Sequence, residues 1–313
     1  MIGAGIFITP GFVAADLPGL VWPLVAWLLG GLLALCGAAV YAELGARLPR
    51  AGGDYQYLTT AFGPMWGFLT GWSALVLTFS AAAAAMCKVS MGYLAAAAGV
   101  SDEGSATLNV VAAPAAVLAL TLANALGARM AGRTTVMLTA VPLVGLCAMF
   151  SYGLFAGRSE PVWPGELLAM PASAWPLALG GAMVPVFFTY SGWNAAAYVA
   201  GELKDPGRTL ARALLLGTAA VTLLYAVVNV VLLATLGDDL RGTNTPGAYA
   251  AMRLLGPGAE RILSLFIGVA ILGSANVTLM AGARIYYAMA VDRLLPPSLA
   301  GTSRRGVPST ALW

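Results

Sequence analysis

The stretch "GAGIF" occupies Gly3 to Phe7, and a second stretch with a similar weakness, "TYSGWN", occupies Thr189 to Asn194. Both lie in segments that are otherwise strongly apolar. Glycine in a helix interior costs about 1 kcal/mol relative to alanine, so each stretch weakens any helix that contains it. Inside a bilayer, unwound backbone is tolerated only where it lines a cavity or is buried in protein. The two stretches therefore predict two interrupted membrane helices that share a site.

The composition indicates a protein whose solvent is lipid. Of the 313 residues, 60% are hydrophobic and 9% are charged, whereas a soluble domain carries about 25% charged residues. A membrane-spanning helix needs about 20 apolar residues. Seven charge-free runs reach that length and predict seven membrane helices, in the ranges 17–42, 55–87, 104–128, 134–157, 167–201, 213–237 and 262–283.

Residues 1–313 are expected to form one all-α polytopic membrane domain that is incomplete at both ends. It is expected to hold half of a first helix, helices two to eight and the start of a ninth. The expected helices cover 1–15 (partial), 20–48, 64–99, 106–126, 133–157, 175–203 with a break near 190–193, 209–236 and 261–292.

The basic residues predict an orientation in the membrane. Loops after helices two, four, six and eight carry ten lysines and arginines, whereas loops after helices three, five and seven carry four. The positive-inside rule therefore places the first set of loops in the cytoplasm of a cell-membrane protein. The ten residues are Arg47, Arg50, Arg129, Arg133, Lys204, Arg208, Arg212, Arg293, Arg304 and Arg305.

Several classes of protein are disfavoured by the same composition. The chain has no histidine, so Ser-His-Asp and Cys-His catalysis and histidine metal sites are excluded. Cys36, Cys87 and Cys147 stand singly in apolar runs, which argues against a disulfide framework or a zinc site. The scattered basic residues form no stripe for nucleic acid. We expect neither an enzyme nor a bound metal or cofactor.

The backbone chemistry of the two breaks points to a zwitterionic ligand. The half-helix that starts at Gly3-x-Gly5 offers free N–H groups and a positive dipole end, which suit a carboxylate. The half-helix that ends at Ser191-Gly192 offers free carbonyls near 188–191, which suit an ammonium group. Together they describe an α-amino acid. The other interpretation is that these small residues only pack helices together, as they usually do in membranes.

Five stretches resemble the amino acid–polyamine–organocation transporters, and the wording is most similar to the L-type amino acid transporter branch and its bacterial relatives. They are "MIGAGIFITPG" (1–11), "YAELGARLPRAGGDYQYL" (41–58), "FGPMWGFLTGW" (62–72), "FFTYSGWNAAAYVAGELKDPGRTLARAL" (187–214) and "SANVTLMAGARIYYAMAVDRLLP" (274–296). The resemblance implies the five-plus-five inverted-repeat transporter fold.

The resemblance also implies a substrate site. It places the substrate carboxylate on the backbone of Gly3, Ala4 and Gly5, and the amino group on carbonyls at Met1 or Ile2 and at Phe188 and Ser191. It makes Phe188 the ring that closes over the substrate, and it sets Trp193 and Asn194 at the border of the site and the outer gate. Tyr190 and Gly192 complete the expected set.

Two positions depart from the family pattern. Ala4 stands where the family commonly has serine, which removes one hydroxyl ligand. Pro142 stands where many members carry a lysine in helix five. In the family that lysine is thought to replace a sodium ion and to serve proton coupling in some members. Its replacement puts proton coupling by that route in doubt.

Charges inside the apolar runs are candidates for coupling or gating. Lys88 in helix three either replaces the missing lysine or extends its charge toward the outer surface. Arg284 in helix eight either pairs with Glu43 or Glu202 to form an inner gate, or lies at the water boundary.

The expected function is secondary transport of amino acids by alternating access, either by exchange or by symport with H⁺ or Na⁺. Neutral substrates are expected because no acidic residue lies near either break in the sequence. The alternative is a non-transporting membrane protein or amino-acid sensor derived from a transporter. The expected partners are the amino acid and the lipid bilayer, with an accessory subunit left open.

Overall fold

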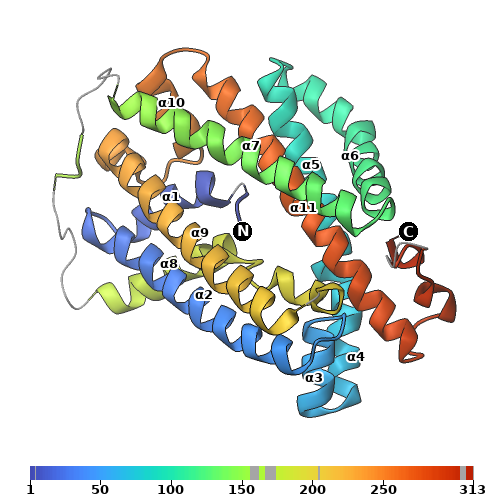
Figure 1. Ribbon diagram of the computed structural model, residues 1–313. Helices are drawn as coiled ribbons and strands as arrows, with labels where there is room; N and C mark the ends of the chain where they lie inside the picture. The colour runs from blue at the N-terminus through green and yellow to red at the C-terminus, as the bar shows by residue number, and fades with distance from the viewer. Residues whose placement is uncertain (4, 156–161, 166–173, 204, 304–307, 313) are drawn as a thin grey trace.

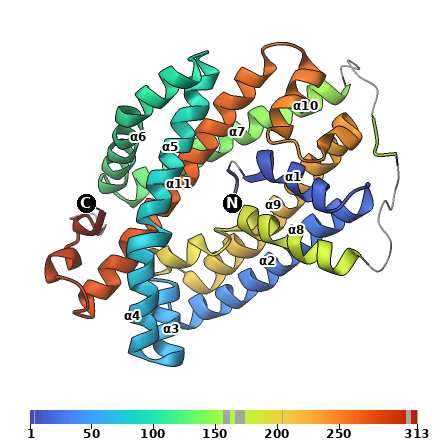
Figure 2. The same cartoon turned by 180° about the vertical axis from the view of Figure 1, so that it is seen from behind.

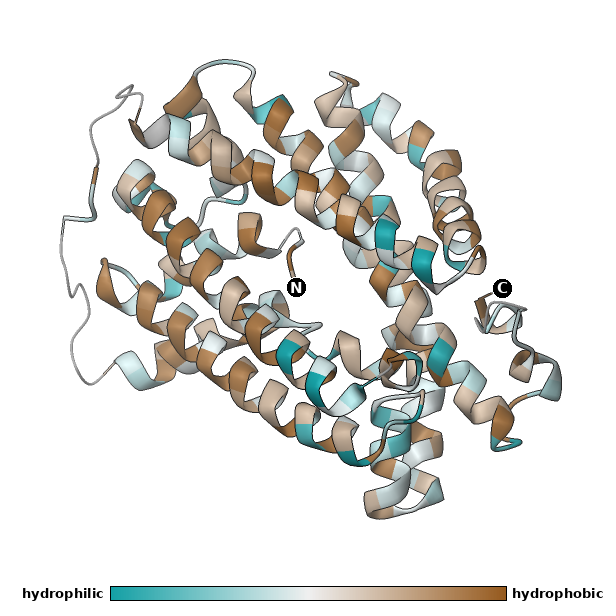
Figure 3. Cartoon of the chain, viewed as in Figure 1, coloured by the Kyte–Doolittle hydropathy of each residue, from teal (hydrophilic) through white to brown (hydrophobic). Residues whose placement is uncertain are grey.

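The computed structural model describes residues 1–3, 5–155, 162–165, 174–203, 205–303 and 308–312, and every regular element in this part of the chain is a helix. Six of the described helices are long and apolar enough to cross a membrane by length and composition. Figure 3 shows these long helices as mainly apolar along their length. The all-α membrane architecture predicted from composition is confirmed.

Among the described residues, the first part of the chain contains seven α-helices and one π-helical turn. The π-helical turn η1 joins α4 to α5, and in it the Phe79 amide donates to the Ala74 carbonyl, one residue beyond the α-helical pattern. The Tyr286 hydroxyl also donates to the Ala74 carbonyl. The elements are α1 (Gly5–Asp16), α2 (Val21–Arg47), α3 (Asp54–Phe62), α4 (Pro64–Ser73), η1 (Ala74–Thr78), α5 (Ser80–Ala97), α6 (Asp102–Ala125) and α7 (Ala128–Phe155).

The second part begins with a helix that is too short to cross a membrane alone. The run 167–201 was expected to supply a membrane helix with a break near 190–193, and in the described part of this run α8 ends at Tyr190 and η2 begins at Ala195. The elements are α8 (Trp175–Tyr190), η2 (Ala195–Glu202, a 3-10 helix), α9 (Pro206–Leu236), η3 (Gly237–Leu240), α10 (Pro246–Leu255), α11 (Ala259–Val291), η4 (Pro297–Ala300) and η5 (Thr310–Leu312).

The membrane helices are counted in chain order, with α4, η1 and α5 together as the third and α8 with η2 as the sixth. Each of the first three then packs against the helix five positions later. α1 lies on α8, α2 lies along α9, and α5 lies along α11. Figure 1 shows α2 and α9 side by side, and Figure 2 shows the same pairing from behind. This pairing is what two five-helix repeats of opposite topology produce, and it supports the inverted-repeat class.

Small residues allow α2 to approach its neighbours closely. A Cβ added at Gly31 would collide with the side chain of Thr222 on α9, and one added at Gly30 would collide with Val186 on α8. Trp27, one turn earlier, is completely buried in the core that these helices form. Membrane helices lack a hydrophobic drive to associate, so such close backbone approach supplies packing energy instead.

We therefore expect Gly31→Ala to lower the thermal unfolding temperature of the purified protein by several degrees. Overpacking a tight contact typically costs about 1–3 kcal/mol. Gly217→Ala on α9 is the matched control, because nothing lies within 4 Å of its added Cβ. Equal unfolding temperatures for both variants would contradict this account of the α2–α9 contact.

Candidate functional site

The first break lies where α1 begins. Met1–Gly3 are not helical and α1 begins at Gly5; Ala4, which was also expected in the site, lies outside the described residues. Both ribbon views place the N-terminus near the middle of the molecule, between α9 and α11 (Figures 1 and 2). The first N–H groups of a helix lack partners within it and carry its positive dipole end. The start of α1 therefore presents hydrogen-bond donors at a central position.

The second break follows α8. This helix ends at Tyr190, the stretch 191–194 forms a turn, and the chain continues as the 3-10 helix η2. Gly192 in this turn has a φ of +91°, a backbone conformation that glycine adopts without steric cost. The last carbonyl groups of α8 lack partners within the helix and carry its negative dipole end.

The structure brings the two breaks together. A Cβ added at Gly192 would lie 3.4 Å from the Met1 nitrogen, and one added at Gly5 would lie 2.9 Å from Oγ1 of Thr189. The two half-helices are antiparallel, since the far end of α1 at Asp16 approaches Gly181 of α8. Opposite dipole ends therefore meet at one level of the bundle.

Two hydroxyl groups from other helices donate hydrogen bonds to carbonyl oxygens of the unwound segments. The Tyr225 hydroxyl of α9 lies 2.7 Å from the Met1 carbonyl oxygen and 3.2 Å from that of Thr189. The Ser274 hydroxyl of α11 donates to the Ile2 carbonyl at 3.0 Å. Neither Tyr225 nor Ser274 is among the site residues predicted from the sequence. Ser274 does begin one of the family-like stretches, whereas Tyr225 has no comparable signal.

Tyr190 is placed differently from the expectation that it lines the substrate site. Its side chain is 1% exposed, and its hydroxyl donates to the Trp27 carbonyl at 3.0 Å. Its ring packs against the rings of Trp27 and Tyr225. Only the backbone of Tyr190 is therefore left to face the break.

Phe188 and Trp193 flank the end of α8. Phe188 is 73% exposed, and its role as the ring that closes over the substrate stays a prediction. Trp193 was expected near an outer gate, but its ring packs edge-on against Tyr41 of α2, with ring centroids 4.8 Å apart. Gly37 lies against the same ring, and a Cβ there would be 2.8 Å from Trp193, so the glycine leaves room for the ring.

A chain of polar contacts connects η2 to the start of α3. Asn194 donates to the Tyr198 hydroxyl at 3.2 Å, and this hydroxyl donates to Oδ2 of Asp54 at 2.7 Å. Tyr198 is only 3% exposed. Asn194, which was expected at an outer gate, therefore lies on the side of the break that faces α3.

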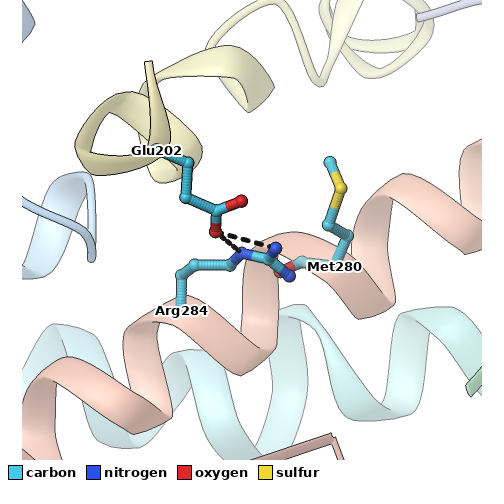
Figure 4. A network of polar contacts seen from close by, with 3 residues as sticks. All are labelled: Glu202, Met280 and Arg284. Carbon is cyan, nitrogen blue, oxygen red and sulfur yellow. Dashed lines mark hydrogen bonds and ion pairs between the residues drawn. The ribbon is translucent and has the colours of Figure 1, made fainter. Parts of the chain in front are cut away.

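An ion pair holds the other end of η2 to α11. Arg284 is 1% exposed, and its Nε and Nη2 both lie 2.8 Å from Oε1 of Glu202 (Figure 4). Its Nη1 donates to the Met280 carbonyl at 2.8 Å. Of the two partners considered for Arg284, the structure selects Glu202. Glu43 instead pairs with Arg47 one turn along α2, where both side chains are exposed.

These contacts lie toward one end of the bundle, which we call the basic end because it carries Arg47, Arg208 and Arg293 at or just beyond the ends of α2, α9 and α11. A further contact at this end is a hydrogen bond of 2.6 Å from the Tyr55 hydroxyl to Asp292. Burial, together with this hydrogen bond to Asp292, raises the pKa of Tyr55, so the phenol remains a donor at neutral pH. The basic end is therefore closed by several polar links between α3, η2 and α11.

Lys88 lies away from the two breaks. Its side chain is exposed and lines an open groove of about 950 Å³ between α5 and α6, beside Ser105 and Asn109 near the start of α6. This position favours the interpretation that Lys88 extends its charge toward the outer surface. It does not favour Lys88 as a substitute for the family lysine expected at the position of Pro142.

An apolar cavity of about 100 Å³ lies next to the first break. It is bordered by Ile2 and Phe7, by residues of α9, and by Leu143 to Ser151 of α7, directly after Pro142. None of its lining residues is charged. Within the described part of the chain, no group of three His, Cys, Asp or Glu side chains is arranged to hold a metal ion.

Comparison with known proteins agrees with this architecture. The family model described as "Amino acid permease" matches residues 1–313. The chain is 31% identical over 304 residues to the serine/threonine exchanger SteT of Bacillus subtilis (strain 168), covering 95% of this chain and 66% of that protein. It is 31% identical over 319 residues to the mouse Asc-type amino acid transporter 1, covering 100% and 60%.

A third relative is the rabbit large neutral amino acids transporter small subunit 2, which is 30% identical over 310 residues and covers 96% of this chain. The chain spans 57% to 66% of the length of these three relatives. Two helix breaks meet, helices of the first half pack against their counterparts in the second half, and the family model matches residues 1–313. These observations agree. The chain belongs to the amino acid permease family of the amino acid–polyamine–organocation superfamily.

Proposed function

We propose that this chain forms the substrate-binding core of a secondary transporter for neutral amino acids. The observation that carries the proposal is the meeting of the α1 start with the α8 end. Backbone N–H groups at the start of α1 and carbonyls at the end of α8 carry partial charges of opposite sign, and an α-amino acid carries one anionic and one cationic group to match them.

In this proposal the substrate carboxylate binds the backbone N–H groups at Gly3 to Gly5. The ammonium group binds carbonyls at Ile2, Phe188 and Ser191. Ile2 already accepts a hydrogen bond from Ser274, and Phe188 accepts one from the Ser191 amide. Each carbonyl oxygen has two lone pairs, so each retains the capacity for a substrate donor.

The contacts at the basic end suggest how access alternates. The Tyr198–Asp54 bond and the Arg284–Glu202 pair both fasten η2 to other helices. Opening a path from the break to this end requires η2 to separate from α3 and α11, and both links to break. We propose that these two links form the inner gate and that the basic end faces the cytoplasm of the cell membrane.

The surroundings of the break support neutral substrates and exchange. The cavity beside Ile2 is apolar, and Pro142 stands where a family lysine serves coupling in some members. SteT is named as an exchanger of serine and threonine, which are neutral amino acids. We therefore propose exchange as the mode of transport, with no ion coupled at this position.

The substrate class is tested by uptake into proteoliposomes that contain the purified protein. Counterflow of labelled alanine or leucine is expected to exceed that of lysine or arginine at least tenfold, since the described residues that line the cavity beside Ile2 include no carboxylate to pair with a cationic side chain. Imposed proton and sodium gradients are expected to leave counterflow unchanged. Faster entry of lysine, or strict dependence on either gradient, would refute this part of the proposal.

The carboxylate site is tested by substitution of Gly5. Gly5→Leu is expected to abolish uptake, because even a Cβ would lie 3.2 Å from the Thr189 backbone and 2.9 Å from its hydroxyl. Gly180→Leu on α8 is the control, since nothing lies within 4 Å of its added Cβ. Both variants should reach the membrane in equal amounts. Normal uptake by Gly5→Leu would remove the paired breaks from the mechanism.

The inner gate is tested by thiol labelling. Ala200 on η2 is fully buried, so a cysteine introduced there reports the opening of the basic end. Adding Glu202→Gln is expected to raise the labelling rate several-fold, because it removes the anionic partner of the buried Arg284 guanidinium.

Glu43→Gln serves as the matched control for this experiment. Its pair with Arg47 is exposed, with side chains 62% and 76% accessible, and such pairs contribute at most about 1 kcal/mol. Labelling should stay at the reference rate in this variant. Equal labelling in Glu202→Gln and Glu43→Gln would argue against a gate at η2.

A further inference from the structure

The groove between α5 and α6 carries one charge that lacks a counter-ion within the described part of the chain. Its walls come from these two helices alone, and its volume is about 950 Å³. Lys88 is the single charged side chain among the lining residues, and no ion pair among the described residues includes it. A cation on a membrane helix is costly unless it reaches water or an anion. The groove therefore has one positive charge to offer to a ligand.

The groove is polar near the turn between its two helices and apolar farther from it. Ser105 and Asn109 line it in the first two turns of α6. Gly92 of α5 lies level with Asn109, since a Cβ added there would be 3.8 Å from the Asn109 amide nitrogen. Lys88 lies one turn deeper on α5, so its flexible stem can extend toward this polar end. The deeper part of the α6 wall is formed by Ala113, Pro114, Val117 and Leu118.

The polar end also contains acceptors that need a donor. Oδ1 of Asn109 is buried and has no hydrogen-bond partner among the described residues. Pro114 has no N–H group, so the Val110 carbonyl one turn earlier lacks its α-helical donor, and both residues line the groove. A buried acceptor without a donor is costly. A ligand that matches this end carries an anionic group for Lys88 and a hydrogen-bond donor for Asn109.

The outer face of α6 is placed to meet lipid. Both ribbon views show α6 at the periphery of the bundle, beside α5 (Figures 1 and 2). Its side chains Leu108, Val111 and Leu122 are exposed. Gly99, in the turn between α5 and α6, lies next to Arg261 near the start of α11, so this turn is at the end of the bundle opposite the basic end. The polar part of the groove is thus near the headgroup level, and the apolar part lies at hydrocarbon depth.

From this arrangement we infer that the groove between α5 and α6 binds a phosphatidylglycerol molecule. The lipid phosphate pairs with Lys88, a hydroxyl of the glycerol headgroup donates to Oδ1 of Asn109, and an acyl chain lies along Val117 and Leu118. The single negative charge of this lipid matches the single positive charge of the groove. Phosphatidylethanolamine and phosphatidylcholine are zwitterionic and leave that charge uncompensated. The inference does not rest on the proposed amino acid site.

The charge match is tested by native mass spectrometry of the purified protein with added lipids that have identical acyl chains. Phosphatidylglycerol is expected to bind more tightly than phosphatidylcholine. Lys88→Gln is expected to raise the dissociation constant of phosphatidylglycerol about tenfold, the size expected for the loss of one charge-assisted hydrogen bond. The Lys88 side chain is exposed, so this substitution leaves the helix packing intact.

Arg208→Gln is the matched control for charge. Arg208 is an exposed arginine near the start of α9, at the basic end, and its substitution removes the same charge from the protein. This variant should bind phosphatidylglycerol as the wild type does. Equal losses of affinity in Arg208→Gln and Lys88→Gln would overturn the inference, because they would show a general attraction of the lipid to cations.

The headgroup donor is tested with phosphatidylmethanol, which has the same charge as phosphatidylglycerol and no headgroup hydroxyl. The wild type is expected to prefer phosphatidylglycerol. Asn109→Leu is expected to remove this preference and to retain the preference for both anionic lipids over phosphatidylcholine. Equal binding of the two anionic lipids by the wild type would overturn the assignment to phosphatidylglycerol, and this comparison needs no variant.

The place of binding is tested by cross-linking. Phosphatidylglycerol with a photoreactive acyl chain is expected to label residues 113–118 of the wild type and to label them less in Lys88→Gln. Labelling spread evenly over the membrane helices would overturn the inference. An amine reagent is expected to modify Lys88 in lipid-free protein. If Lys88 is protected there, a protein segment or a second copy of the chain covers the groove, and the inference fails.

Discussion

The structure depends on one constraint, which is that backbone groups released from a helix inside a membrane must find partners. Each unpaired N–H or C=O in hydrocarbon costs several kcal/mol, so a broken helix persists only with a built environment around the break. Here the environment comes from side-chain hydroxyls on two other helices. Tyr225 of α9 serves the carbonyls of Met1 and Thr189, and Ser274 of α11 serves that of Ile2. These groups hold the segments open in a defined geometry.

The same constraint explains why η2 is fastened so firmly. After the turn at Gly192 the chain resumes as a 3-10 helix, whose hydrogen bonds are poorer than those of an α-helix. Its position is therefore determined by tertiary contacts, namely the Tyr198–Asp54 bond at one point and the Glu202–Arg284 pair at its end. These two polar links can be exchanged for water when η2 moves, whereas the buried Ala200 also packs in an apolar cluster with Ala38 and Leu210.

Much of this arrangement could be predicted from the sequence, and the limits have physical reasons. Charge-free runs predicted the membrane helices, and glycines inside apolar segments predicted the two breaks, since composition and helix propensity are local properties. The partner of Arg284 was left open between Glu43 and Glu202, because the choice depends on how helices are rotated and on where η2 is carried by the break. Trp193 and Asn194 were placed by the family resemblance, and the contacts of the Trp193 ring with Tyr41 and of Asn194 with Tyr198 depend on how the chain turns after α8. Tyr225 had no signal, because a tyrosine in an apolar helix is ordinary and its partners are 36 and 224 residues away.

The antiparallel contact of α1 and α8 gives the site its polarity. Two parallel half-helices ending at one level would present dipole ends of the same sign, and they would favour a simple anion or a simple cation. The contacts of Gly5 with Thr189 and of Gly181 with Asp16 show instead that one helix starts where the other ends. Opposite ends then face each other, and the ligand that best replaces their mutual attraction carries both charges on neighbouring atoms. A carboxylate or an amine alone would satisfy one end and leave the other exposed to hydrocarbon, so in the proposed site the preference for a zwitterion comes from backbone direction before any side chain contributes.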